Sequence, residues 1–245
     1  MPGQTHTADA RVLNQRTLEK DHKRLAALLQ PGVSVLDIGC GTGAISAGIA
    51  RACGEGRVVG MDRDVALLDQ ARRMHPAANL SFVHGDVLTL AVEETFDIVN
   101  AARVLQWVSD PGGAVLRMAA AAKPGGLVIA LDYNHADNRM EPPPPCAFQR
   151  FYEAFLHWRA TRGWDNRMGD HLPALFAAAE LREISSTIED EVSANSLWPN
   201  VLETLGPQMV AEGAMSEPER AGAMEALYDY CGEQTLVLRA VAGTR

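Results

Sequence analysis

The sequence predicts one α/β domain built on a doubly wound, mostly parallel sheet of seven strands with a helical cap. Two observations support this fold class. Short apolar runs alternate with helix-forming stretches in the first half of the chain, which is typical of parallel strands joined by right-handed crossover helices. The chain also has 245 residues, of which 47% are hydrophobic and 22% charged, as expected for a single folded domain.

The first half of the chain is expected to supply a leading helix and then five strands with their crossover helices. Residues 11–29 mix apolar and charged side chains at helical spacing, and Pro31 and Gly32 should end this helix. Apolar runs predict strands over residues 33–38, 57–61, 80–83, 96–100 and 127–132. Crossover helices are expected over residues 45–52, 65–74 and 114–122.

The second half of the chain breaks this alternation. The consecutive prolines at 142–145 predict a stiff surface linker, because proline fits neither a helix interior nor a central strand. Later elements are expected in this order: helices over 148–161 and 172–179, a strand over 182–188, helical pieces over 195–231, and an alternating strand over 234–241. The extra helices should form a cap, as active-site insertions often do.

The most informative segment is an apolar strand that runs directly into three glycines. Residues 35–43 read VLDIGCGTG, and Gly39, Gly41 and Gly43 let the backbone turn sharply and approach a ligand at a helix N-terminus. Cys40 lies between two of these glycines. The spacing also satisfies the loose dinucleotide pattern G-x-G-x-x-G/A, so it does not by itself distinguish between ligands.

Three acids near strand ends narrow the choice of ligand. Asp37 lies two residues before Gly39, where it would repel a pyrophosphate but suit an ammonium group, directly or through water. Asp62 ends the next strand, where an acid can accept hydrogen bonds from both ribose hydroxyls. Asp86 follows the third strand, where an adenine amino group could donate to it. The alternative is that Asp62 is a helix cap and Asp86 a turn residue.

Five segments between about residues 33 and 132 resemble the class I S-adenosylmethionine methyltransferases, particularly the group similar to the menaquinone and ubiquinone biosynthetic C-methyltransferases. In order, they read VLDIGCGTG, VVGMDRD, HGDV, FDIVNAARVLQW and KPGGLVIALDYN. The resemblance implies a Rossmann-like fold, S-adenosylmethionine as cofactor and S-adenosylhomocysteine as product. It also extends the cofactor site to Ala102, with Arg63 and Val87 beside the adenosine.

Residues 1–245 are expected to form a single methyltransferase domain with several parts, because no boundary in the chain is strong enough to split it. They are a cap helix in residues 1–30, a cofactor-binding core in 31–140, helical cap insertions in 141–180 and 195–231, and closing strands in 182–188 and 234–241.

The acceptor is expected to be a small molecule methylated on oxygen, carbon or nitrogen. Enzymes that methylate base amines resemble one another in an N/D-P-P-Y/F motif after the fourth strand, whereas residues 100–103 here read NAAR. Polar and aromatic residues after the fourth and fifth strands are expected to open onto the edge of the sheet where ligands bind. These candidate substrate contacts are Arg103, Gln106, Trp107, Tyr133 and Asn134.

His135 is the candidate general base for an acceptor that must lose a proton. The alternatives are that His135 is a solvent-exposed loop residue, that Trp107 packs in the core and that Arg103 belongs to a salt bridge.

The segment 148–164 is rich in aromatic residues and could wall an apolar acceptor. Phe151, Phe155 and Trp158 are the candidate contacts, and the alternative is that this aromatic stripe only packs the helix onto the domain. His157 and Arg159 are expected at the surface.

Composition and charge limit the function further. The net charge of -9, with lysine and arginine scattered along the chain, argues against nucleic acid as a partner. We expect no membrane span and a cytoplasmic protein, because no apolar run approaches about 20 residues. The four cysteines are far apart and no metal motif occurs, so no metal is expected. The oligomeric state is open.

The sequence therefore predicts transfer of a methyl group from S-adenosylmethionine to a small molecule. A noncatalytic protein that binds S-adenosylmethionine would carry the same motifs. A nicotinamide-dependent oxidoreductase is the other alternative, supported by the loose glycine pattern and Asp62.

Overall fold

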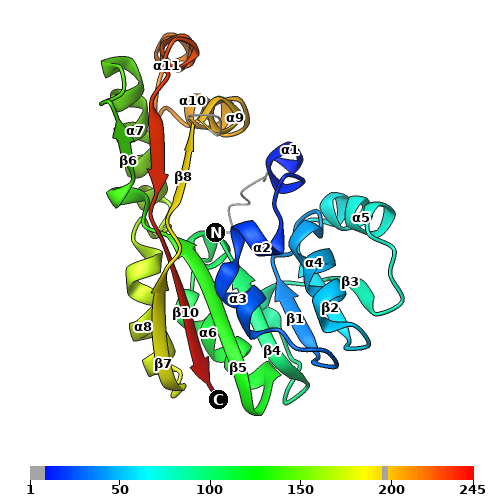
Figure 1. Ribbon diagram of the computed structural model, residues 1–245. Helices are drawn as coiled ribbons and strands as arrows, with labels where there is room; N and C mark the ends of the chain where they lie inside the picture. Colours follow the sequence, from blue (N-terminus) through cyan, green and yellow to red (C-terminus); the bar gives the residue numbers. More distant parts are fainter. Residues whose placement is uncertain (1–8, 195–197) are drawn as a thin grey trace.

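The computed structural model describes residues 9–194 and 198–245, which form a seven-stranded sheet with helices on both faces and a cap beyond its edge (Figure 1). The strands of this sheet are β1 (Val35–Ile38), β2 (Val58–Asp62), β3 (Leu80–His84), β4 (Phe96–Ala102), β5 (Ala122–Tyr133), β7 (Arg182–Ile188) and β10 (Leu238–Thr244). Their order is β3-β2-β1-β4-β5-β10-β7. The first five pair in parallel and β10 is antiparallel to both neighbours, which confirms the predicted doubly wound sheet.

Side chains of successive strand residues point to opposite faces of the sheet, and each face has its own helices. Leu36 and Ile38 pack in the core with α6 (Pro111–Ala121) and α8 (Met168–Ala178). Val35 faces the other side and packs with α4 (Ala44–Cys53). The helix α5 (Val65–Met74) lies on the same side as α4, against Phe82.

The N-terminal segment forms three short helices instead of the one helix expected over residues 11–29. They are α1 (Ala10–Leu13), α2 (Leu18–Asp21) and α3 (Lys23–Leu28). Thr17 interrupts the helix because its backbone is extended and its side chain accepts a hydrogen bond from the N–H of Lys20, which starts a new helix. Leu18 and Leu25 are buried in the core cluster that includes α4 residues.

The cap contains a second sheet that the sequence did not predict. Its strands are β6 (Arg139–Glu141), β8 (Glu191–Ala194) and β9 (Glu233–Leu236), in the order β6-β9-β8. The expected strand over 234–241 is interrupted at Val237, whose N–H donates to Asn138 and whose carbonyl accepts from Asn134. The chain therefore passes from the small sheet into the large one at this residue.

Four helices complete the cap and pack around one aromatic cluster. They are α7 (Cys146–Thr161), α9 (Trp198–Thr204), α10 (Gly206–Ala211) and α11 (Glu217–Tyr228). Residues 195–197, at the start of the expected helical insert, lie outside the described residues. Three single turns, η1 (Val87–Thr89), η2 (Leu105–Trp107) and η3 (His135–Asp137), follow β3, β4 and β5 at the edge that faces the cap.

Gly48 in α4 is expected to tolerate no side chain, because a Cβ there would lie 2.7 Å from the Cβ of Leu18. Gly48→Ala should lower the free energy of unfolding by about 1–3 kcal/mol by forcing α2 away from α4. The matched control is Gly222→Ala in α11, where a Cβ meets nothing within 4 Å. That change should raise stability by about 0.5–1 kcal/mol. Urea denaturation of both variants measures this, and a Gly48→Ala protein as stable as Gly222→Ala would contradict the close approach.

Candidate functional site

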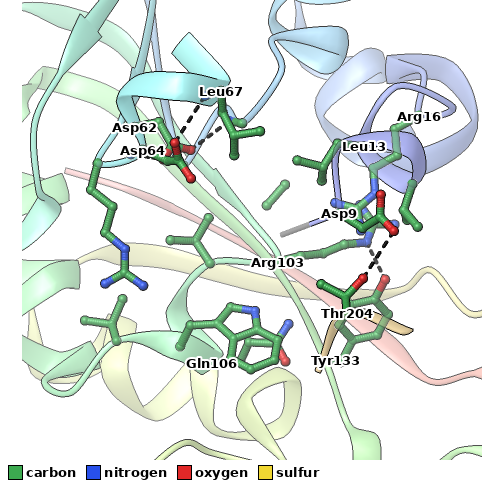
Figure 2. A pocket seen from close by; sticks show the side chains of 18 of the residues that line it. Asp9, Leu13, Arg16, Asp62, Asp64, Leu67, Arg103, Gln106, Tyr133 and Thr204 are labelled. Atoms are coloured by element: carbon green, nitrogen blue, oxygen red, sulfur yellow. Dashed lines mark hydrogen bonds between the residues drawn. The ribbon is translucent and has the colours of Figure 1, made fainter. Parts of the chain in front are cut away.

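A cavity of about 280 Å³ lies at the carboxyl edge of the sheet, between the core and the cap (Figure 2). The core contributes residues that follow each parallel strand from β1 to β5, which is where parallel α/β sheets bind ligands. The N-terminal segment contributes Asp9, Val12, Leu13 and Arg16. The cap contributes Phe155, Trp198, Asn200, Val201, Thr204, Leu205, Gln234 and Leu236.

Most of the residues predicted from the sequence line this cavity. On the predicted cofactor side they are Gly39, Gly41, Asp62, Arg63, Asp86, Val87 and Ala102. On the predicted acceptor side they are Arg103, Gln106, Trp107, Tyr133, His135 and Phe155. The structure does not bring six others to the cavity wall: Asp37, Cys40, Gly43, Asn134, Phe151 and Trp158.

The glycine turn after β1 combines two roles. Gly39, Gly41 and Gly43 all have φ between +55° and +76°, a conformation that side chains disfavour. Gly41 lies under the N-terminal segment, since a Cβ there would be 2.8 Å from the Cδ1 of Leu13. Gly43 is instead a packing residue, because a Cβ there would meet Phe82 at 2.6 Å. Only the first two glycines of the turn therefore line the cavity.

Asp62 at the end of β2 holds the glycine turn as well as facing the cavity. One carboxylate oxygen accepts from the N–H of Gly41 at 2.8 Å, and the other accepts from the N–H of Asp64 at 2.9 Å. Asp64, rather than Asp62, caps helix α5 through the N–H groups of Ala66 and Leu67. The helix-cap interpretation of Asp62 is therefore wrong (Figure 2).

Asp86 is both a turn residue and a cavity residue. Its carboxylate accepts from the N–H of Leu88 at 2.9 Å and caps the single turn η1. Because a carboxylate has about four acceptor positions, this bond leaves room for a donor from a ligand.

Asp37 points away from the cavity, to the side of the sheet that carries α4. It is buried, and its oxygens accept from the Ser46 hydroxyl at 2.5 Å and the Asn100 amide at 2.8 Å. The side chain of Ile38 lines the cavity instead, because neighbouring residues of a strand face opposite ways. Burial raises the pKa of Asp37 to about 6.

The other predicted residues that do not line the cavity have packing roles. Phe151 and Trp158 are buried in the aromatic cluster of the cap, as the packing alternative proposed. Cys40 packs beside α5. Asn134 is buried, and its side-chain oxygen accepts from the N–H of Asp170.

Gln106 and His135 form a buried pair in the wall, with Arg159 behind them. The Gln106 Oε1 atom accepts from Arg159 Nη2 at 2.9 Å and lies 2.7 Å from His135 Nε2. Since that oxygen carries no hydrogen, His135 Nε2 must donate to it. The exposed-loop interpretation of His135 is therefore wrong, because the residue is only 8% exposed.

Arg159 was expected at the surface, and that expectation is wrong. Its side chain is fully buried, with its guanidinium over the Trp107 ring at 4.1 Å and its Nε donating to Asn166. Burial lowers the pKa of Arg159 to about 10. The sequence did contain a signal, because Phe151, Phe155 and Arg159 are spaced four residues apart and so share the buried face of α7.

Asp132 at the end of β5 also lies buried close to this group. Its carboxylate accepts from the backbone N–H groups of Gln106 and Tyr133 at 3.2 Å each. Burial raises the pKa of Asp132 to about 7. It therefore fixes the two loops that carry cavity residues.

Neither a metal-binding cluster nor a membrane-spanning helix occurs in the part of the chain that the structure describes. Residues 9–194 and 198–245 contain no cluster of three His, Cys, Asp or Glu side chains that could hold a metal ion. Over the same residues, every helix is too short or too polar to cross a bilayer.

The fold and the site together define a doubly wound α/β domain with a cavity at the carboxyl edge of its sheet. Residues 35–126 match the protein family described as "Methyltransferase domain", which confirms the resemblance drawn from the sequence. These residues are therefore similar to methyltransferase domains.

Two similar relatives are named methyltransferases. The chain is 37% identical to demethylmenaquinone methyltransferase of Shouchella clausii over 109 residues, covering 42% of this chain and 46% of the relative. It is 31% identical to trans-aconitate 2-methyltransferase of Deinococcus radiodurans over 137 residues, covering 55% and 52%. The chain thus spans about half the length of these relatives.

A similar fold occurs in phosphoethanolamine N-methyltransferase 2 of Haemonchus contortus, whose structure is a complex with S-adenosyl-L-methionine. The TM-score is 0.58 at 16% identity, and the alignment covers all of this chain and 54% of that one. This likeness concerns the fold.

The raised pKa of Asp37 predicts a pH-dependent stability. The unfolded carboxyl titrates near 3.8 and the folded one near 6, so the folded protein holds the extra proton and loses stability as pH rises through this window. Asp37→Asn keeps the shape without the charge, and should remove roughly 1–3 kcal/mol of this decline. Urea denaturation from pH 4 to 7.5 measures it, with the exposed Asp110→Asn as control. Parallel curves for all three proteins would contradict the assignment.

Proposed function

We propose that the protein transfers a methyl group from S-adenosylmethionine to an oxygen, carbon or nitrogen of a small molecule and releases S-adenosylhomocysteine. The observation that carries the proposal is that the glycine turn, Asp62 and the Asp86 loop face one cavity whose far walls come from the cap. The methyltransferase domain at residues 35–126 supports it. So does the bound S-adenosyl-L-methionine in the similarly folded worm enzyme.

The residues present fit this cofactor. The two cavity glycines have left-handed backbones that bring main-chain atoms to the ligand, and Asp62 retains acceptor positions for the two ribose hydroxyls. Met61, Leu67 and Val87 supply apolar walls near Asp86, where the adenine would lie. When bound, S-adenosylmethionine supplies a methyl group activated by its sulfonium.

The remaining walls suit an enzyme that excludes water and orients a small acceptor. Trp107, Phe155 and Trp198 give an aromatic surface on the acceptor side. The buried Gln106–Arg159 contact orients the ring of His135, the candidate general base, in the acceptor-side wall. Alignment and exclusion of water supply much of the rate in such transfers.

The proposal includes a small-molecule acceptor and a cytoplasmic location. The two relatives are named for different small molecules, demethylmenaquinone and trans-aconitate, which supports a small-molecule acceptor without choosing one. The net charge of -9 supports a partner other than nucleic acid. A cytoplasmic location is supported by the free state of Cys40, Cys53, Cys146 and Cys231.

Binding and turnover test the proposal directly. Calorimetry should show S-adenosylhomocysteine binding and no NADH binding. Protein given methyl-labelled S-adenosylmethionine and a metabolite extract should produce a labelled small molecule. Binding without any labelled product would favour the noncatalytic alternative, and NADH binding alone would favour the oxidoreductase.

Asp62→Ala should weaken S-adenosylhomocysteine binding by about 2–4 kcal/mol, because two ribose hydroxyls lose a charged acceptor. It should also lower stability, because the N–H groups of Gly41 and Asp64 lose their acceptor. The matched control is Asp64→Ala, which removes the cap of α5 and should cost about 1 kcal/mol of stability with a smaller effect on affinity. An Asp62→Ala affinity within twofold of wild type would contradict the ribose assignment.

A further inference from the structure

Two arginines from distant parts of the chain meet in one wall of the cavity. Arg16 lies between α1 and α2, and Arg103 follows β4; both line the cavity. Figure 2 shows their side chains coming together beside Tyr133. Burial lowers the pKa of Arg16, and the positive charge of Arg103 lowers it further.

Arg103 is held rigidly and has its donors in use. Its Nε donates to the Tyr133 hydroxyl at 2.8 Å, its Nη1 donates to the carbonyl of Asp21 at 2.9 Å, and its Nη2 contacts Glu191. The side chain is buried and its backbone is left-handed, with φ of 61°. Arg103 therefore places a fixed positive charge in this part of the cavity wall.

Arg16 differs from Arg103 in having its donors open. Within residues 9–194 and 198–245, its guanidinium makes no hydrogen bond or ion pair, although it lies half-buried in the cavity wall. A guanidinium taken partly out of water is costly unless an acceptor replaces that water. Its planar fork of N–H groups matches the two oxygens of a carboxylate.

The carboxylates of the protein around Arg16 have partners already. Asp9 is bonded to Arg11 at 2.7 Å and to Thr204 at 3.2 Å. Glu191 contacts Arg103, and Asp21 accepts from the backbone N–H of Thr17. Because Glu191 and Asp21 also lower the local positive potential, the wall suits a singly charged carboxylate better than a doubly charged phosphate.

We propose that Arg16, supported by Arg103 and Tyr133, forms a carboxylate-binding subsite at this end of the cavity. The inference rests on the proposed function, which offers two sources of the same chemical group. One is the amino-acid end of the cofactor, and the other is a carboxylate on an otherwise apolar acceptor. Either ligand receives forked N–H groups from Arg16, while Arg103 supplies fixed positive charge behind it.

The experiment compares Arg16→Met with Arg11→Met by calorimetry. Methionine keeps the apolar stem and removes the charge, and Arg11 is an exposed arginine of the same segment that does not line the cavity. The probes are S-adenosylhomocysteine, 5′-methylthioadenosine, which lacks the amino-acid end, and phenylacetate added to protein saturated with S-adenosylhomocysteine. Arg16→Lys, which keeps the charge without the fork, should show a smaller loss than Arg16→Met and guards against misfolding.

The outcomes separate the two sources. A loss of about 10- to 100-fold for S-adenosylhomocysteine in Arg16→Met, with 5′-methylthioadenosine unchanged, assigns the subsite to the cofactor. A similar loss confined to phenylacetate assigns it to the acceptor. Two results together overturn the inference. The first is that Arg16→Met and Arg11→Met bind S-adenosylhomocysteine equally well. The second is that phenylacetate either does not bind the wild-type protein or binds Arg16→Met as well as it binds the wild-type protein. A wild-type protein that binds neither nucleoside contradicts the proposed function instead.

Discussion

A buried carboxylate beneath the glycine turn fixes the N-terminal half of the site. Asp37 is out of reach of water, so both its oxygens need donors from the protein, and Ser46 and Asn100 supply them. Asn100 uses its amide nitrogen for this bond, and its oxygen accepts from His22 Nε2 at 2.8 Å. Burial lowers the pKa of His22 to about 3, which keeps the ring neutral. This chain of bonds ties the N-terminal segment to the sheet and so places Leu13 against the glycine turn.

The acceptor side depends on a buried cation in a comparable way. Arg159 comes from the cap, yet its main partners are Gln106 and Trp107, which follow β4 in the core. A guanidinium in this position must keep its hydrogen bonds, because an unpaired buried charge is strongly destabilising. The contact therefore joins cap and core at the cavity, and it orients His135 through the shared Gln106 oxygen.

The sequence was informative where local chemistry alone determines position. Asp62 and Asp86 follow strands, and the carboxyl ends of parallel strands share one edge, so both could be placed. The direction of the Asp37 side chain could not be predicted. Strand β1 is buried on both faces, so its pattern does not reveal which face lies toward the cavity. Trp198 and Arg16 reach the cavity only through the docking of segments remote in sequence. The burial of Arg159 follows from its helical spacing on α7, although its charge alone predicts exposure.

The position of β10 determines the order in which the site can be assembled. β10 lies between β5 and β7, so β7 has no strand of the large sheet to pair with until residues 238–244 are in place. The adjoining β9 likewise joins β6 to β8 and carries Gln234 and Leu236 into the cavity wall. During synthesis, the first five strands can pair before β9, the central strand of the cap sheet, has been made. The cavity wall that the core supplies can therefore form before the wall that the cap supplies, which needs the last strands.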